Sequence, residues 1–426
     1  MLSRLARLVR GFNTRAGRNA ARNLVGIAVC TALSQAAMLG MIVLAANHLE
    51  PAVFGSFLFV LTVQNYLSLI GSAGAQPAVV RDAAAHPERM DEITSAFFAV
   101  TGMSGLLIGI CALVGAFVAP LSPDERAVIL LFAVANVAGS MNLSPLFDSQ
   151  RQQMKGSVGT TIADMLAIAS AGFLALSGWL SLQAIGIILA CKWIAGTLIQ
   201  ALLYHFTVRS IRLRFSVSDA WRMARSSYPI LASYFLCILP LSFGVFFLRF
   251  FRGPEATGIF GLACQIGSLT FAFAWLGIRI IQPHIGGEFG LHATFIRKLI
   301  LFLALFLIGL GSAAFLGGTV VIWIAFDAAF RDAIAPMGVL ITASVILSAG
   351  VAASLYLLRL HQERVVLIIY VSSATVYLGG CGLLVPDHGI AGAAAMTLVA
   401  AVVATSATLV LAKRMVRKVQ AASAGL

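Results

Sequence analysis

Long apolar runs follow one another along the whole chain, separated by charged residues, Pro or Gly. A helix needs about 20 apolar residues to cross a hydrocarbon core of about 30 Å. Twelve such runs occur, at 24–46, 54–79, 94–119, 127–147, 157–177, 184–204, 229–248, 258–281, 299–325, 334–357, 365–385 and 390–412. The connections are too short for a soluble domain, and alternating β-branched runs typical of an outer-membrane barrel are absent. We therefore expect an all-α polytopic membrane protein with about twelve transmembrane helices.

Composition agrees with this pattern, and the distribution of charge indicates an orientation. Charged residues form 11% of the chain, against roughly 25% in soluble domains. A net charge of +13 would favour nucleic acid in a soluble protein. With a cytoplasmic N-terminus, however, 23 Lys and Arg residues fall on inner segments and four on outer segments. We therefore predict a multi-pass membrane protein with both termini cytoplasmic. We expect its basic arm to contact membrane lipid, and we expect neither a nucleic-acid partner nor a removable signal peptide.

A short motif recurs at a fixed offset of 203 residues. It reads P-x-x-x-G-x-F, with Pro51, Gly55 and Phe57 in the first copy and Pro254, Gly258 and Phe260 in the second. At the same offset, the turn before the sixth run matches the turn before the twelfth. Two loops with one offset indicate two parallel six-helix halves around a central cavity. We expect a cytoplasmic arm, a first bundle, a cytoplasmic linker, a second bundle and a cytoplasmic tail at 1–22, 23–204, 205–228, 229–412 and 413–426, respectively.

Two opposite charges lie in neighbouring predicted spans, where an ionisable group costs at least about 2.5–3.5 kcal/mol at the bilayer centre. With a rise of about 1.5 Å per residue, Asp164 lies about 10 Å and Lys192 about 18 Å from the cytoplasmic face. Two interpretations stay open. The residues pair and hold the two spans together, or Lys192 attracts an anionic substrate while Asp164 takes part in coupling. At the repeat offset they fall on Leu367 and Ala395, so the charges are not part of the duplicated scaffold, which favours a function.

Three further cations are candidates for a substrate cavity. Arg279, near the inner end of its span, is either a snorkelling anchor or a site of anion capture. Its counterpart at the repeat offset is Gln76, so a lining position is expected in both halves. Arg249 and Arg252 depart from the positive-inside pattern at an outer helix end. They form a cationic outer vestibule or are interfacial residues without a special role.

Uncharged polar residues within the spans have two interpretations as well. They line the cavity and meet sugar hydroxyls, or they form hydrogen bonds between helices; these residues are Gln35, Gln64, Asn65, Asn136 and Asn142. At the end of the second span, Arg81 and Asp82 are expected to form an interfacial ion pair or to contact lipid head groups. The chain has no P-loop, no G-x-S-x-G and no H-E-x-x-H. We therefore expect no catalytic residue, no metal and no cofactor.

The first repeat copy lies in the run NHLEPAVFGSFLFVLTVQNYLSLIGSAGAQPAVVRDAAA, which resembles the amino-terminal signature of Wzx-type polysaccharide flippases. The second half adds GPEATGIFGLA and DHGIAGAAAMT, which are similar to motifs of the same family. That family belongs to the multidrug/oligosaccharidyl-lipid/polysaccharide exporter superfamily. The residues that carry the resemblance are Leu49, Pro51, Phe54, Gly55, Gly71, Gly74, Arg81, Asp82, Pro254 and Gly258.

The resemblance implies a non-enzymatic flippase of the bacterial inner membrane. Such a flippase moves an oligosaccharide linked to undecaprenyl diphosphate from the cytoplasmic to the periplasmic leaflet by alternating access. Coupling to either protons or sodium is a further expectation, as are a polysaccharide polymerase and glycosyltransferases as neighbours. O-antigen, lipopolysaccharide or exopolysaccharide units are the expected class of cargo. Other classes stay open: a multidrug exporter of the same superfamily, a lipid II flippase, which typically has fourteen spans, and a membrane polysaccharide polymerase or ligase, which would have long outer loops.

Overall fold

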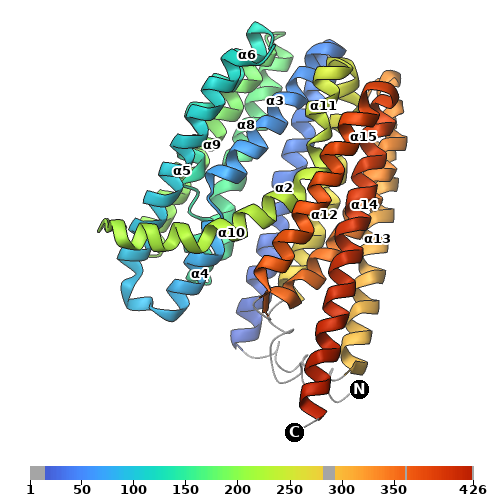
Figure 1. Cartoon of the computed structure of the whole chain (residues 1–426). Coiled ribbons are helices and arrows are strands. Elements are labelled where there is room, and N and C mark those ends of the chain that lie inside the picture. Colours follow the sequence, from blue (N-terminus) through green and yellow to red (C-terminus); the bar gives the residue numbers. More distant parts are fainter. Residues whose placement is uncertain (1–14, 282–292, 360–361, 425–426) are drawn as a thin grey trace. The chain divides into compact units, whose positions relative to one another are not determined.

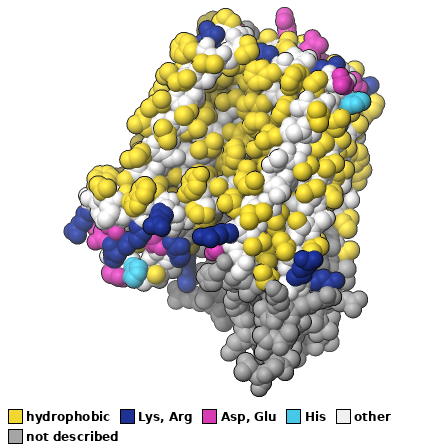
Figure 2. All heavy atoms as spheres, in the orientation of Figure 1, with side chains coloured by type: hydrophobic (Ala, Val, Ile, Leu, Met, Phe, Trp, Pro, Cys, Tyr) yellow, Lys and Arg dark blue, Asp and Glu magenta, His cyan; other side chains and the backbone are white. Residues whose placement is uncertain are grey.

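The computed structural model describes residues 15–281, 293–359 and 362–424. Within those ranges every regular element is a helix. In this described part of the chain, ten helices are long and apolar enough to cross a membrane, or eleven if α10 and α11, which are bent by 47° at their junction, form one span. On the face in Figure 2, hydrophobic side chains cover the long sides of the helices and charged ones gather near helix ends. The chain is therefore an all-helical, multi-span membrane protein, and the count of twelve stays a prediction.

The helices fall into two compact units, of which the first contains the described residues up to His48 and Val63–Tyr228. In Figure 1, α5, α6, α8 and α9 run side by side. The helices that begin in or contribute to unit 1 are α2 (Arg15–His48), the second part of α3 (Pro51–Gly71), α4 (Ala75–Ala85), the 3-10 helix η1 (Pro87–Arg89), α5 (Met90–Val118), α6 (Pro123–Ser140), α7 (Ser144–Ser149), α8 (Gln153–Leu176), α9 (Leu182–Thr207) and the start of α10 (Val217–Ser242).

The second unit contains Leu49–Thr62 and the described residues from Pro229 onward. Helix α3 is therefore shared between the two units, since its first twelve residues belong to unit 2. Neighbouring helices α13, α14 and α15 run alongside one another in Figure 1. Besides α3 and the end of α10, unit 2 contains α11 (Gly244–Phe251), α12 (Pro254–Ile281), α13 (Ala293–Ala325), the 3-10 helix η3 (Ala328–Ala333), α14 (Ile334–Arg359) and α15 (Glu363–Ala424).

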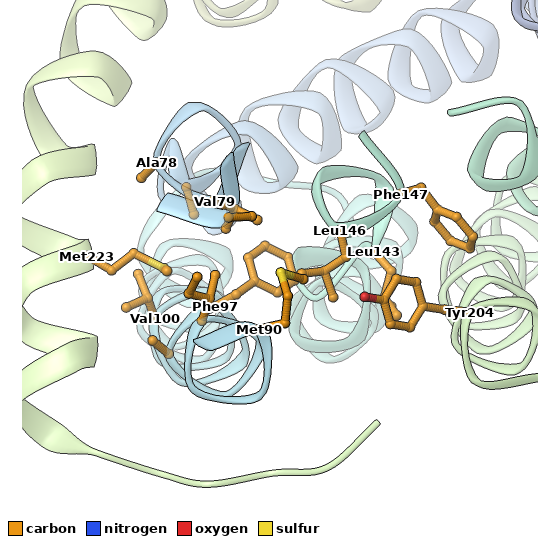
Figure 3. Close-up of a cluster of buried hydrophobic side chains, with 14 residues drawn as sticks. Ala78, Val79, Met90, Phe97, Val100, Leu143, Leu146, Phe147, Tyr204 and Met223 are labelled. Atoms are coloured by element: carbon orange, nitrogen blue, oxygen red, sulfur yellow. The ribbon is translucent and has the colours of Figure 1, made fainter. Parts of the chain in front are cut away.

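A buried apolar cluster closes the end of unit 1 at which α5 begins and α9 ends. Figure 3 shows Met223 of α10 reaching toward Phe97 and the other cluster side chains of α5. The rings of Phe147 and Tyr204 meet edge to face, with centroids 5.3 Å apart. Burial of these aromatic and aliphatic side chains together packs the short helices α4 and α7 against the long helices α5 and α9. The start of α10 is thereby packed into unit 1 as a helix, within the range predicted as the linker.

Two predicted spans are broken helices, which the apolar pattern does not reveal. In the run 54–79, Ala73 and Gly74 take left-handed φ values of 52° and 62°, and this ends α3 before α4 begins. In the run 127–147, the Asn142 side chain accepts a hydrogen bond from the backbone N–H of Ser144 at 3.0 Å, so the chain turns between α6 and α7. Both breaks put helix ends inside an apolar run.

The last two predicted spans are joined through a kink at Gly389. Its backbone, with φ 54° and ψ −128°, is not helical and divides α15. Helix α10 carries Pro229 and Pro240 in its interior, each of which lacks the N–H of a regular helix. The carbonyl of Pro240 accepts a hydrogen bond from Thr397 Oγ1 at 2.9 Å, which ties α10 to α15 within unit 2.

Candidate functional site

The opposite charges predicted in neighbouring spans meet between α8 and α9 of unit 1. Small residues let these two helices approach closely. A Cβ atom added at Gly196 would lie 3.5 Å from the Cβ of Ala163, and one added at Gly159 would lie 2.9 Å from Gln200 Cγ. These contacts place the α8 and α9 backbones near each other on one side of the charged residues, toward the start of α8 and the end of α9. The two helices are close enough for the long side chain of Lys192 to reach the short side chain of Asp164.

Lys192 Nζ lies 3.0 Å from Asp164 Oδ1, which is an ion pair. The ammonium also lies 5.8 Å from the ring centroid of Trp193. The side chains of Lys192 and Asp164 are 20% and 15% exposed, so the pair is largely buried. Removing one partner of such a pair leaves an uncompensated charge at a cost of about 3–5 kcal/mol. The geometry agrees with pairing, and a role in substrate binding or coupling stays a prediction.

Gln76 donates a hydrogen bond from Nε2 to Asp148 Oδ2 at 2.6 Å and joins α4 to α7. The sequence analysis did not single out Asp148, because it directly follows the predicted span 127–147. The break between α6 and α7 brings this carboxylate back toward α4. Gln76 is therefore hydrogen-bonded to a carboxylate within unit 1, and its predicted position in the lining of a substrate cavity stays a prediction.

Two predicted cavity residues are buried and incompletely hydrogen-bonded. Gln64 is fully buried; its Nε2 donates to Ser68 Oγ at 3.3 Å, while its Oε1 has no partner among the described residues. Asn136 is also fully buried, and neither of its amide atoms has a partner in the described part of the chain. A Cβ at Gly71 would lie 3.0 Å from Asn136 Nδ2, so this glycine keeps α3 close to α6. Orphaned amide groups of this kind are costly in an apolar interior, so water or a polar ligand is expected to satisfy them.

The other polar candidates have different surroundings. Asn65 is exposed and Gln35 is half-buried, and the Asn142 side chain accepts the hydrogen bond from the Ser144 N–H described above. A residue that the sequence analysis missed, Gln200, is fully buried and satisfied from three directions. Its Oε1 accepts from the Leu143 N–H, and its Nε2 donates to the Gly156 carbonyl and to Ser144 Oγ. Gln200 holds the broken α6–α7 segment against α8 and α9, so its role is structural.

The two copies of the P-x-x-x-G-x-F motif lie against each other in unit 2. A Cβ at Gly258 would lie 3.2 Å from the Gly55 Cα, and a Cβ at Gly55 would overlap the carbonyl oxygen of Pro254. Pro51 and Pro254 are the first residues of α3 and α12. Positions that are equivalent at the repeat offset therefore touch at the start of both helices. The contact leaves no room for a side chain at Gly55, which is a physical reason for the glycine in the motif.

The two arginines of the predicted outer vestibule have partners within unit 2. The Arg252 guanidinium donates to the backbone carbonyls of Asp387 at 2.5 Å and Val385 at 3.4 Å, just before the kink at Gly389. Those carbonyls end a helix segment, where a cation is favourable. Arg249 is half-buried and its guanidinium carbon lies 5.9 Å from the ring centroid of Phe59. Arg252 thus supports the α15 kink, and the vestibule itself stays a prediction.

Arg81 and Asp82 form the ion pair expected of them, with Arg81 Nε 3.0 Å from Asp82 Oδ1. Nearby ion pairs tie loops and helix starts of unit 1 together, a network that the sequence analysis missed because its members are far apart in the chain. Arg89 Nη2 lies 3.3 Å from Asp219 Oδ1, which joins η1 to the start of α10. Further pairs join Arg209 to Asp91 and Arg222 to Asp219.

The predicted cavity residues are divided between the units. Asp164, Lys192, Gln76, Gln64 and Asn65 belong to unit 1, whereas Arg249, Arg252 and Arg279 belong to unit 2. The backbone of Arg279 lies in α12, and its side chain lies outside the described residues. A single cavity that contains all of them stays a prediction. No group of three His, Cys, Asp or Glu side chains suited to a metal ion occurs in the described residues.

Comparison with known proteins gives a family and a fold. The model of the polysaccharide biosynthesis protein family matches residues 20–274. No curated protein matches the chain. The fold is similar to that of an inward-facing multidrug resistance MATE family transporter of the MOP superfamily, with a TM-score of 0.72 at 12% identity over 92% of this chain and 99% of that one.

Two further solved structures have the same fold. The lipid II flippase MurJ, in an inward closed conformation, gives a TM-score of 0.71 at 12% identity over 91% of this chain and 87% of that one. A MOP superfamily transporter from Pyrococcus furiosus, described as having a binding pocket of reverse polarity, gives 0.59 at 12% identity over 94% and 96%. The fold of this chain is thus that of MOP superfamily transporters.

Proposed function

We propose that this chain, which belongs to the polysaccharide biosynthesis protein family, is a membrane flippase that moves an oligosaccharide linked to undecaprenyl diphosphate from the cytoplasmic to the periplasmic leaflet. The observation that carries the proposal is the family match over residues 20–274 of a multi-span chain. A fold shared with a lipid II flippase supports a lipid-linked substrate. O-antigen or exopolysaccharide units are the proposed cargo.

Charge inside the spans supports an anionic substrate. The diphosphate carries negative charge that needs a cationic partner when it leaves the aqueous face, while the prenyl chain stays in lipid. Lys192 is proposed to supply that charge, and its existing partner Asp164 would be released from the ion pair when the diphosphate binds. The freed carboxylate would then take up a proton or a sodium ion, which couples substrate binding to the ion gradient.

Transport by alternating access requires that bound substrate changes the relative stability of two states. A substrate promotes the switch only by interacting more strongly with the occluded state than with either open state. The exchange of partners at Lys192 offers such a difference, because the Asp164–Lys192 pair is intact only without substrate. Cationic capture at Arg279 is proposed as the entry step on the cytoplasmic side.

A multidrug exporter is the second candidate, because a MATE family transporter has the same fold. Exporters of cationic compounds need acidic residues that face the cavity. In the predicted spans of this chain, Asp164 is the one acid well inside a span, against two bases, Lys192 and Arg279. This balance favours an anionic substrate over a cationic one. A polymerase or ligase is less favoured, since the predicted outer loops are short.

Deletion of the gene followed by analysis of lipid-linked sugars tests the proposal. Surface polysaccharide should be lost, and lipid-linked repeat units should accumulate on the cytoplasmic leaflet. Complementation with the unaltered chain should restore export, and complementation with Arg279→Gln at the same membrane level should restore less. Normal surface polysaccharide in the deletion strain, or altered drug resistance without any change in lipid-linked sugars, would contradict the proposal. Neighbouring genes for glycosyltransferases and a polysaccharide polymerase would support it.

A further inference from the structure

Unit 1 contains a second polar feature, away from the Asp164–Lys192 pair. A pocket of about 350 Å³ opens where α8 begins, α9 ends and α2 enters its apolar span. Pockets of this size are in the range that holds small ligands or head groups. Its position at the start of α8 and the end of α9, beside the point where the apolar span of α2 begins, places it at the boundary between membrane and water. The sequence analysis assigned no role to its residues.

The polar side of this pocket is strongly cationic. Arg151 and Lys155 both line it, and among the described residues neither has an acidic partner within 4.0 Å. Within the described ranges, Lys155 Nζ donates a hydrogen bond to the backbone carbonyl of Thr207 at 3.1 Å. The first turn of α8 contains no acidic residue, so the positive end of the helix dipole adds to the two cations. Several described Arg residues near this end of unit 1 do form ion pairs, for example Arg209 with Asp91.

The backbone of Arg151 is held in an unusual conformation beside the pocket. Its φ of 56° is left-handed, which is strained for a residue with a side chain. The Asn23 side chain donates to the Arg151 carbonyl at 3.4 Å and supports this conformation. Strain of this kind is concentrated at ligand-binding positions. Here it directs a cationic residue to the rim of the pocket.

The remaining walls indicate what type of ligand fits. Met154, Val158 and Leu203 make the pocket apolar on the side of the spans. Gln152 also lines it, and its Oε1 is buried without a hydrogen-bond partner among the described residues. A hydroxyl group of a ligand would satisfy this acceptor. The pocket therefore combines sites for a phosphate, for a hydroxyl and for a hydrocarbon chain.

We propose that this pocket binds a lipid whose head group carries a phosphate and a hydroxyl. Arg151, Lys155 and the α8 N-terminus hold the phosphate, Gln152 accepts the hydroxyl hydrogen bond, and the apolar wall takes the first part of the tail. Two sources share this chemistry, an anionic phospholipid such as phosphatidylglycerol and a polyprenyl-phosphate sugar. The proposal does not depend on the transport activity proposed above, because the site lies away from the Asp164–Lys192 pair.

Lipid binding to the purified full chain, followed by native mass spectrometry, tests the site. The test variant is Arg151→Gln/Lys155→Gln. The matched control is Arg212→Gln/Arg214→Gln, which removes two exposed charges outside the pocket. Phosphatidylglycerol, phosphatidylcholine and an undecaprenyl-phosphate sugar are titrated in parallel. Loss of charge-assisted hydrogen bonds to a phosphate should raise the Kd of the test variant at least about tenfold, with little change in the control.

Each outcome decides the proposal. Preferential binding of phosphatidylglycerol that the test variant loses supports the site with a membrane phospholipid as ligand. Preferential binding of the undecaprenyl-phosphate sugar that the test variant loses supports the site with the carrier lipid as ligand. Equal binding by test and control variants, or phosphatidylcholine binding as tightly as both of the other lipids, overturns the proposal. A melting temperature equal to that of the unaltered chain shows that the test variant is folded, and Gln152→Leu, which keeps both cations, should weaken binding on its own.

Discussion

Removing one charge of the Asp164–Lys192 pair should cost more than removing both. The perturbations are Asp164→Asn, Lys192→Met and the combination of the two. In the unaltered chain, Nζ and Oδ1 are 3.0 Å apart and both side chains are at least 80% shielded. Each single variant leaves one charge without a partner among apolar helices. The double variant leaves two neutral side chains of nearly the same volume, so no charge remains to be compensated.

The expected size follows from that burial. Breaking a buried pair from one side costs about 3–5 kcal/mol, and the partial exposure of this pair favours the lower end, about 3 kcal/mol. Such a cost reduces the ratio of folded to unfolded protein by roughly two powers of ten. Replacement of both partners by neutral groups is expected to be within about 1 kcal/mol of the unaltered chain. The coupling energy of the cycle, which is the cost of the double variant minus the costs of the two single variants, should therefore have a magnitude of about 5–6 kcal/mol.

Two measurements on the same four proteins separate stability from transport. Thermal unfolding of the four purified proteins gives the stability differences of the double-mutant cycle. The melting temperature of each single variant should be lower than that of the unaltered chain by about 6 °C or more. Complementation of polysaccharide export, normalised to membrane level, gives the activity. If Lys192 provides charge for the diphosphate, the double variant should be as stable as the unaltered chain and should fail to export. A stable double variant that exports normally would refute the functional interpretation. The pair would then only hold α8 and α9 together.

Three further predictions follow from the geometry. Gly55→Ala should lower stability or membrane level because the Cβ would overlap the Pro254 carbonyl, whereas Gly172→Ala, with no atom within 4 Å of the added Cβ, should be neutral or up to about 1 kcal/mol stabilising in a thermal assay. Arg252→Gln should weaken the α15 kink, seen as faster amide hydrogen exchange at residues around Gly389; unchanged exchange would contradict the assignment. Asp219→Asn should detach the start of α10, so that a protease added to purified protein cleaves there sooner than in the unaltered chain.

Apolar runs predict where helices lie in this chain, and charges at their ends predict an orientation. The breaks inside two runs were missed because they depend on single backbone positions, such as the left-handed Ala73, whose side chain gives no sign of it. The start of α6 was placed four residues late, although Ser122 and Glu125 form a capping box that is readable in the sequence. Helix α3 is divided between the two units because of contacts with residues that are distant in the sequence. The repeat offset does not predict such contacts.

Pairing within the site was partly accessible from spacing alone. The levels of Asp164 and Lys192 were predicted to differ by about 8 Å at 1.5 Å per residue, and the long lysine side chain closes that gap. The pairing of Gln76 with Asp148 depends on the α6–α7 break, and the role of Arg252 depends on the kink at Gly389. Neither could be predicted from helical periodicity, because both are consequences of non-helical backbone.

Translocation by the purified chain is the most direct test of the proposed function. The full chain is reconstituted into vesicles that contain an undecaprenyl-diphosphate-linked oligosaccharide in both leaflets, and an enzyme that cannot cross the bilayer cleaves the exposed sugar. A flippase should make nearly all of the oligosaccharide accessible over time, at a rate that depends on Lys192. Protection of the inner-leaflet fraction, equal to that in vesicles without protein, would contradict the account.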